Sequence, residues 1–503
     1  MLVWNRLLFL LTLFAACLPI APAQSASTLL SSIQSDNLQL VSTPLPPAGT
    51  PLAPSVLTLL QSRKALVEAL IRTSPAQVRS ILLPDPTASG LIAADPAVAS
   101  LIETDGPRTG TLHVAFAEDL AHSFSQPRYT LKSSTGTISL YPTTTLGLGA
   151  LINRRVSASG VGTSTYLAAE SVQPAPAATT TSTTSDISCT TKGDQNTAVI
   201  ILEMPGLVYP AGKDDPGFWQ TRFFDPATRS LNSIWREMSA NQTSASGSVY
   251  GPYTLNQAYD CDQSEEISAA GFAAASGQVD LSTVTRVAFI FPTLSCGWVG
   301  LGTLGCEEAD ANVTHPYSRF WVSINPNTDF GDDLDDTVAH EMGHNLTLGH
   351  ANSYDYGTEA LGPFDTANTG LVNTEYADPY STMGHHGGFY AAPHRALFLN
   401  WLQPGTDYHE VQSSGTYTVL PTPTNSGVRA LRIQRNPVPG SWIWAEYRQN
   451  TGSIDTLIPN TVPNSTIFQG ALIHYEDPYL IDSTFDGMPS QPMRPLSLRT
   501  CST

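Results

Sequence analysis

Residues 340–350 bring three histidines and a glutamate into one short stretch, H-E-M-G-H-N-L-T-L-G-H. Residues four positions apart lie on one face of an α-helix, about 6 Å apart along its axis, so His340 and His344 can bind one ion. Imidazole nitrogen is a common zinc ligand, and a catalytic zinc site keeps one position open for water. Glu341 follows His340 on the helix and can reach that water as a general base. The stretch therefore predicts a helix that carries two ligands of a catalytic zinc ion.

His350 indicates how the chain continues after this helix. On an ideal helix, His350 would lie about 9 Å beyond His344 and on another face. It can bind the same ion only if the helix ends and the chain folds back, and Asn345 and Gly349 are residues that tolerate a left-handed turn. A chance occurrence is the alternative, but with 11 histidines in 503 residues the odds of H-E-x-x-H alone are below about one in a thousand. We therefore predict that His340, His344 and His350 are the three protein ligands.

A cluster of aspartates precedes the motif: Asp332, Asp333, Asp335 and Asp336. Acidic side chains favour the N-terminus of a helix, so we interpret the cluster as capping and solvation of the zinc-binding helix. A structural Ca²⁺ site is the alternative interpretation, because calcium binds carboxylate oxygens.

The N-terminus has the pattern of a signal peptide. Arg6 provides the positive charge, residues 7–20 are apolar, and the sequence A-P-A at 21–23 is a cleavage pattern of the A-x-A type. We predict that residues 1–23 are removed and that the protein is secreted and extracellular. Sequons are then candidate glycan sites, at Asn241, Asn312 and Asn464.

The chain is acidic and has no second long apolar stretch. Its formal net charge is -19 and its pI about 4.8, so it repels phosphate backbones and anionic lipid, and we expect no nucleic-acid partner. Crossing a membrane needs roughly 20 apolar residues, and we expect no membrane span. With 41% hydrophobic and 13% charged residues, the chain can bury substantial cores.

Composition divides the remaining chain into four segments. Residues 24–172 have few aromatics, with a helical apolar spacing between 55 and 80, and we predict that they are a pro-segment. Residues 173–190 form a Pro/Ser/Thr-rich linker that proteases can cut. Strands alternate with helices in 191–406, which implies an α/β layer arrangement around the histidine motif. Residues 407–503 have short strands between Gly/Pro turns and are predicted to form a small β-rich domain.

Removal of the signal peptide leaves five of the six cysteines. In an oxidising compartment disulfides are the default interpretation. We expect Cys296 to pair with Cys306, because they are close in a Gly-rich loop, and Cys189 to pair with Cys261, which leaves Cys501 over. Spacing alone does not fix these pairs. A thiolate of Cys189 on the zinc is a less favoured alternative.

A second motif follows the histidines, Y-A-D-P-Y-S-T-M-G at 376–384. It predicts a turn bounded by Pro and Gly with Met383 at its tip, 33 residues after His350. A methionine in a turn usually fills a core, but at this position we interpret Met383 as the residue that lies beneath the zinc. His385 could approach the substrate oxyanion, although an exposed loop histidine is the favoured interpretation.

These motifs, together with A-A-P-H-R-A-L-F-L-N-W-L at 391–402, resemble the gametolysin group of metzincin metallopeptidases. The resemblance covers roughly residues 190–450, and the histidine and methionine motifs are its specific part. It implies an α/β (α+β) metzincin catalytic domain with a mixed twisted sheet and a long zinc-binding helix. It also implies a secreted proenzyme that uses Zn²⁺ and cleaves proteins of an extracellular matrix or cell wall.

The chain departs from the metzincin pattern at Thr347, where the family usually has glycine. A β-branched residue in a left-handed turn is strained by on the order of 1–3 kcal/mol. Either Thr347 bears this strain or the turn lies closer to Gly349. The chain also ends abruptly at Thr503, which suggests an incomplete C-terminal domain.

Three interpretations of the motif remain open. In the first, the chain is an active endopeptidase in which Glu341 activates water. In the second, it is a metzincin-like matrix-binding or adhesion protein whose catalysis is weak or lost. The third, a purely structural zinc site, is the weakest, because such sites usually have four protein ligands, often cysteines. Glu341 favours the first interpretation, since binding alone needs no general base.

Overall fold

The structure is a computed structural model of the chain, and it contains two compact units. The first comprises Met1–Thr104 and Val161–Ser164, and the second comprises Asp105–Gly160 and Thr165–Thr503. The described residues are 25–119, 124–134, 136–145, 147–176, 189–293, 296–325, 333–355, 372–384, 387–435, 442–463 and 465–476. The predicted signal peptide, most of the predicted linker, His385 and Cys501 lie outside these ranges. We predict that residues 24–172 are a pro-segment that is cut from the rest of the chain. The structure does not test this cleavage, so the pro-segment stays a prediction.

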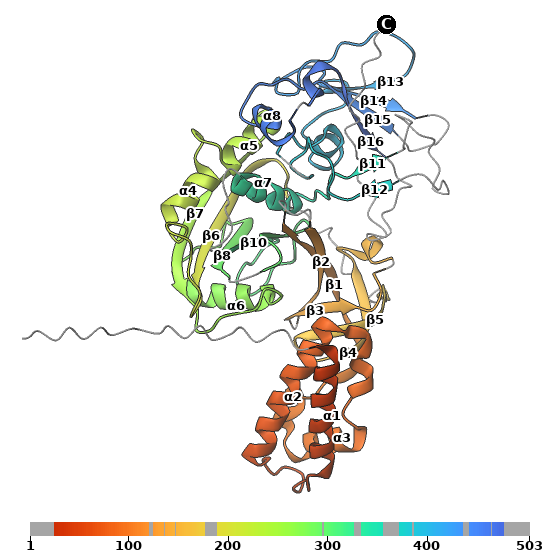
Figure 1. Ribbon diagram of the computed structural model, residues 1–503, viewed down its shortest axis with the longest axis vertical. Helices are drawn as coiled ribbons and strands as arrows, with labels where there is room; N and C mark the ends of the chain where they lie inside the picture. The colour runs from red at the N-terminus through yellow and green to blue at the C-terminus, as the bar shows by residue number, and fades with distance from the viewer. Residues whose placement is uncertain are drawn as a thin grey trace, which may run out of the picture. The chain divides into compact units, whose positions relative to one another are not determined.

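The first unit is built mainly of helices (Figure 1, red to orange). They are α1 (Ala26–Ser42), α2 (Pro54–Thr73) and α3 (Asp85–Ala94), with 3-10 helices η1 (Pro75–Ile81) and η2 (Pro96–Leu101). Helix α2 confirms the helical spacing predicted between residues 55 and 80. Proline in the first turn suits its start, because the first helical N–H groups have no partner within the helix. Buried Arg63 on α2 is neutralised by buried Glu103, with 2.5 Å between Nη1 and Oε2.

A ten-stranded mixed sheet runs through the second unit. Its first five strands are β1 (Thr104–Asp119), β2 (Phe124–Ser133), β3 (Gly136–Pro142), β4 (Arg155–Gly162) and β5 (Tyr166–Pro174). They pair in the order β1-β2-β3-β5-β4 and back to β1, so these strands close on themselves. Strand β1 also pairs with β9 (Gly300–Thr303), which joins the five strands to the rest of the sheet.

The other half of the sheet has the order β9-β10-β8-β6-β7. Its further strands are β6 (Gly193–Glu203), β7 (Thr243–Thr254), β8 (Arg286–Pro292) and β10 (Ser318–Ile324). These four strands are mutually parallel, whereas β9 is antiparallel to β10. Strands alternate with helices in this part of the chain, as predicted.

Helices cover both faces of this half of the sheet (Figure 1). Helices α4 (Pro216–Phe224), α5 (Leu231–Met238) and α7 (Asp333–Asn345) share one core with alternate residues of β6, such as Val199 and Ile201. Helix α6 (Ser264–Ala275) shares the opposite core with Ile200 and Leu202. Because both faces are covered, the strands are apolar on both sides, as parallel strands in layered folds are. The fold is thus mixed α/β, as predicted at this coarser level.

A smaller four-stranded sheet follows in the C-terminal part of the second unit. It consists of β13 (Tyr408–Val411), β14 (Ala430–Gln434), β15 (Trp442–Glu446) and β16 (Leu472–Glu476), in that order. A two-stranded sheet, β11 (Ser353–Asp355) with β12 (Val372–Thr374), precedes it, and the short helix α8 (Ile458–Thr461) lies between β15 and β16 in the chain.

The two disulfides join different cysteines from those expected. Cys189 bonds Cys306 and Cys261 bonds Cys296, with Cα atoms 5.7 and 5.3 Å apart. The expected Cys296–Cys306 bond is wrong because extended strand β9 lies between these residues and carries them apart. The disulfide interpretation of Cys189 itself is confirmed.

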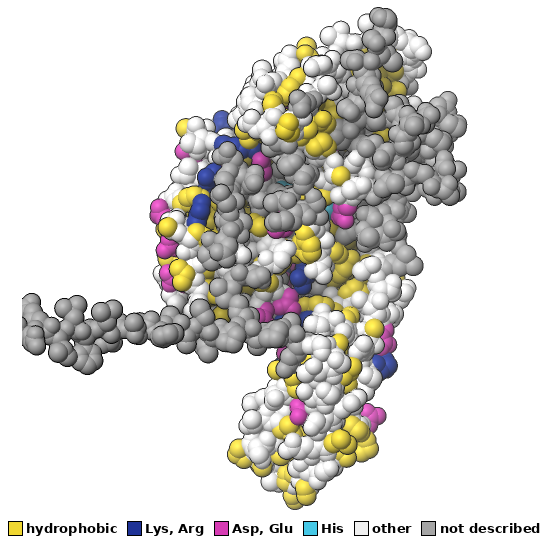
Figure 2. All heavy atoms as spheres, in the orientation of Figure 1, with side chains coloured by type: hydrophobic (Ala, Val, Ile, Leu, Met, Phe, Trp, Pro, Cys, Tyr) yellow, Lys and Arg dark blue, Asp and Glu magenta, His cyan; other side chains and the backbone are white. Residues whose placement is uncertain are grey.

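The described surface carries both signs of charge on the face shown in Figure 2, in spite of the net negative charge. No helix within the described ranges combines the length and apolar character that crossing a bilayer requires.

Candidate metal site

Helix α7 carries the first part of the site. Leu334, Val338 and Met342 pack it into the core beneath the sheet, and this fixes which face the histidines occupy. His340 and His344 then lie one turn apart on a single face, with ring centroids 4.9 Å apart. Both side chains are fully buried.

The chain folds back immediately after α7. Leu348 N–H donates to Gly343 O at 3.0 Å, and Thr347 N–H donates to His344 O at 2.8 Å, which is the hydrogen-bond pattern of a Schellman motif. Thr347 has a positive φ of 75°, and the left-handed turn does not move to Gly349 or Asn345. Threonine therefore occupies the position at which glycine is usual. This turn brings His350 back, with its ring centroid 4.9 Å from that of His344.

Each imidazole is oriented by an acceptor on its Nδ1 side. Nδ1 of His340 is 2.5 Å from Thr382 O, and Nδ1 of His344 is 2.7 Å from Leu348 O. Nδ1 of His350 is 2.8 Å from an oxygen of Glu375. With protons on Nδ1, all three Nε2 atoms present lone pairs, as in histidine-bound metal sites. The donor set therefore fits a zinc ion.

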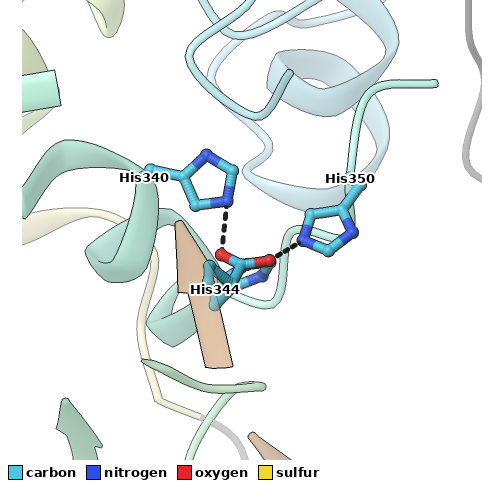
Figure 3. A group of neighbouring side chains, drawn as sticks. His340, His344 and His350 are labelled. Carbon is cyan, nitrogen blue, oxygen red and sulfur yellow. Dashed lines mark hydrogen bonds and ion pairs between the residues drawn. The ribbon is translucent and has the colours of Figure 1, made fainter. Parts of the chain in front are cut away.

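Glu118 of strand β1 completes the group, and no sequence pattern pointed to it. Its Oε2 lies 2.8 Å from Nε2 of His340 and 3.0 Å from Nε2 of His344, and its Oε1 contacts Nε2 of His350. Figure 3 shows the imidazoles turned toward this one carboxylate. The four buried side chains offer ligand atoms that all lie within 4.8 Å of one another, so this group could hold a metal ion.

Charge couples the members of this group. Burial alone would raise the pKa of Glu118, but His350, His340 and His344 hold it well below the usual value. Burial likewise opposes a charge on His350, yet the Glu118 and Glu375 carboxylates raise its pKa to about 10. Burial lowers the pKa of His344 to about 4. A metal at the same point would replace the proton of His350, because ligands bind metals in the deprotonated form.

Glu341 lies next to this group, and its carboxylate is not held by hydrogen bonds to the described residues. Its carboxylate is fully buried, and neither oxygen has a hydrogen-bond partner among the described residues. Gly300 on β9 makes room for it, since a Cβ there would lie 2.1 Å from Oε1 of Glu341. Burial and the charge of Glu118 raise its pKa well above the usual value. A carboxyl group in this setting is suited to accept and release a proton.

Met383 lies against helix α7 beside Gly343. It is fully buried in the same core as Met342, and its backbone oxygen accepts the N–H of Ala351 at 2.7 Å. The approach is close because Gly343 has no side chain: a Cβ at this position would lie 2.4 Å from the sulfur of Met383. His385, which could approach an oxyanion, lies outside the described residues.

Tyr376 belongs to the second motif, but no role was predicted for it. It is 2% exposed, and its φ of 70° is a strained value for a bulky residue. Its hydroxyl lies 3.4 Å from Nε2 of His340, and its ring centroid lies 4.7 Å from that of His350. Burial raises the pKa of Tyr376 well above its usual value, so the hydroxyl stays protonated and can donate.

Buried charges connect the Met383 turn to the small sheet. Asp378 accepts the N–H of Tyr380 at 2.9 Å, and its other oxygen lies 3.2 Å from Nε2 of His474 on β16. Nδ1 of His474 lies 3.1 Å from Glu446 on β15, which also binds Arg395 at 2.7 Å. The small sheet thereby holds the loop that carries Met383.

The acidic cluster before α7 is used in ion pairs. Asp335 binds Arg222 at 2.6 Å, and Asp336 binds Arg229. Asp332 lies outside the described residues, and the side chain of Asp333 is likewise not described. Asp335 and Asp336 lie in the first turn of α7, as expected, but there they pair with arginines and Asp335 is buried from solvent. The Ca²⁺ alternative stays a prediction.

Searches with protein-family models and among curated proteins find no match to this chain.

Proposed function

We propose that the protein is a secreted zinc endopeptidase of the metzincin type, similar to the gametolysin group, that cleaves proteins of an extracellular matrix or cell wall. One observation carries the proposal. Nε2 atoms of three histidines converge on one point, and the carboxylate of Glu341, without a partner, lies beside them.

Several features support this assignment beyond the ligand set. One half of the large sheet has four parallel strands and one antiparallel strand, β9, and this half packs on the helix that carries His340 and His344. The sharp turn at Thr347 returns His350 to the same point, and Met383 lies against the helix. These are the arrangements that the resemblance implies. The two disulfides suit an oxidising, extracellular compartment.

The chain's own residues have separate roles in the proposed reaction. The histidines would hold the zinc through Nε2, while Thr382, Leu348 and Glu375 fix the rings through Nδ1. When bound, zinc makes water more acidic and polarises the scissile carbonyl. Glu341 accepts a proton from the attacking water and delivers it to the leaving amine. The hydroxyl of Tyr376 is placed to donate a hydrogen bond to the developing oxyanion.

The second candidate is a matrix-binding or adhesion protein without catalysis. Such a protein could use the histidines to hold an ion, but it would need no proton acceptor beside them. The room that Gly300 leaves for Glu341 favours the enzyme.

The test compares wild type with Glu341→Gln after cleavage in the predicted linker and separation from the pro-segment. Zinc content is measured with hydrolysis of a matrix glycoprotein and of a broad substrate such as casein. We expect both proteins to hold about one zinc and only the wild type to cleave, with a loss of about 10²-fold or more in Glu341→Gln. Activity near that of the wild type in Glu341→Gln would contradict the general-base role. Zinc-loaded, separated wild type that cleaves nothing would favour the adhesion protein.

A further inference from the structure

Both oxygens of the Glu118 carboxylate contact Nε2 atoms of the three histidines. Oε2 contacts His340 and His344, and Oε1 contacts His350. The residue is 1% exposed. A catalytic zinc site needs one position open for water, whereas a site with four protein ligands is closed. Here the fourth position is taken by a side chain from a distant part of the sequence.

The backbone of β1 holds Glu118 in this position. Residues 115–118 pair antiparallel with β9, with Ala115 opposite Thr303 and Glu118 opposite Gly300. Val299 N–H also donates to Glu118 O at 2.6 Å. Side chains alternate along a strand, so Phe116 faces the same side as Glu118. The ring of Phe116 stacks on that of His344, with centroids 4.7 Å apart.

A structural ion pair alone explains this arrangement poorly. Burying a carboxylate among imidazoles carries a large desolvation penalty, and such pairs are weak sources of stability. The three Nε2 atoms and the carboxylate would all be satisfied by one divalent cation at their common point. The geometry is that of a ligand set with four members.

We infer that Glu118 is the fourth metal ligand in the uncleaved chain and keeps the enzyme latent by excluding water and substrate from the site. This inference rests on the proposed function and gives the predicted pro-segment its means of inhibition. Activation then requires β1 to leave β9, so that Glu118 withdraws from the histidines.

The disulfides indicate that cutting the linker is not sufficient. Both bonds in the described part of the chain join cysteines from Cys189, near the end of the predicted linker, onward: Cys189 with Cys306 and Cys261 with Cys296. After a cut in the linker before Cys189, β1 would therefore stay in place through noncovalent contacts alone. Besides the β1–β9 pairing, these include Lys132 Nζ donating to Glu308 O at 2.7 Å and Tyr166 Oη donating to Glu266 at 2.5 Å. A nicked but undissociated protein is expected to remain latent.

The decisive experiment measures access to the metal rather than catalysis. The full chain is loaded with Co²⁺, and acetohydroxamate is titrated while the visible spectrum of the cobalt is followed. Wild type is compared with Glu118→Gln, which removes the charge, and with Glu118→Ala, which also opens space. Glu170→Gln, an exposed glutamate on β5, is the matched control. We expect acetohydroxamate to change the spectra of both Glu118 variants at concentrations that leave wild type and control unchanged.

Metal retention provides a second readout. Glu118→Gln should release zinc to a competing chelator about tenfold faster or more, since the loss of outer-shell partners alone weakens metal binding by about 10–100-fold. If the Glu118 variants fail to fold, wild type suffices. Its cobalt should bind acetohydroxamate only after the linker is cut and the pro-segment is separated under mild denaturant and removed.

The outcomes separate this inference from the proposed function. Equal access in intact wild type and in the Glu118 variants, or in intact and separated wild type, overturns the role of Glu118 even if the separated protein cleaves substrates. Unequal access together with no hydrolysis by the separated protein supports Glu118 as a ligand and refutes the peptidase.

Discussion

Thr347 offers a direct measurement of strain at the turn that delivers His350. Its φ is 75° and its side chain is exposed, so Thr347→Gly should remove the strain without losing buried contacts. A non-glycine residue in this conformation is strained by on the order of 1–3 kcal/mol. The greater freedom of glycine in the unfolded chain returns about 0.4–1 kcal/mol of that gain. We expect a net stabilisation of about 1 kcal/mol.

The assay is calorimetric unfolding of the zinc-loaded full chain at one fixed scan rate, because large disulfide-bonded proteins often unfold irreversibly. A gain of 1 kcal/mol raises the Tm by about 2–4 °C in a unit of 150–250 residues and by less in a larger one. Thr347→Ala is the matched control, since alanine keeps a Cβ and with it most of the strain. Zinc affinity should be unchanged in both variants because the hydrogen bonds of the turn are made by the backbone.

A Tm for Thr347→Gly that is equal to or below that of wild type would refute the reasoning. The same conclusion would follow if Thr347→Ala were stabilised as much as Thr347→Gly. In either case the left-handed conformation of Thr347 would not be a net source of strain: it would cost little by itself, or another contact of Thr347 would offset it.

Three further predictions concern the site and its support. His350→Ala should weaken zinc binding severely, because two histidines and a carboxylate remain; wild-type affinity by chelator competition would exclude His350 as a ligand. Tyr376→Phe should lower kcat of the separated enzyme by about 10²–10³-fold with little change in KM, as loss of an oxyanion donor does, whereas an unchanged kcat would leave Tyr376 with a packing role. Burial opposes the charge on His474, but Asp378 and Glu446 raise its pKa above 6.5 in the folded protein. The ion pairs of protonated His474 therefore stabilise the folded protein fully below about pH 6.5, and this stabilisation is lost as the pH rises through the pKa of His474 in the folded protein. The Tm difference between wild type and His474→Gln should then be greatest near pH 6 and shrink toward pH 9, and a constant difference would contradict the ion pair.

Local patterns predicted the parts of the site that depend on local geometry. His340 and His344 are four residues apart, so a helix necessarily places them together, and the structure brings them together as expected. The need for a turn before His350 followed from helix geometry, but its position did not, because Thr347 is a residue with a low intrinsic tendency to adopt a positive φ. The alternation of strands and helices predicted for residues 191–406 is also observed, and the parallel strands there are apolar because both their faces are buried.

Local sequence patterns could not predict contacts between residues that are far apart in the sequence. Glu118 is 222 residues before His340 in the sequence, and only the pairing of β1 with β9 brings them together. Its one sequence signal was a charged residue at the end of the apolar run H-V-A-F-A-E. The disulfide pairs were wrong for a related reason: closeness in sequence was used, while strand β9 separates Cys296 from Cys306.

The pairing of β1 with β9 also has a consequence for how the protein is made. An unpaired sheet edge is a template on which other chains can add strands and aggregate. During synthesis β1 is available to cover that edge, because it precedes β9 in the chain and pairs with it in the folded protein. The edge that would be uncovered on maturation is only the four residues of β9, two of them glycine, and so short a strand is a poor template. The strand that carries Glu118 would in this way also protect the edge of the sheet from pairing with other chains while the protein folds.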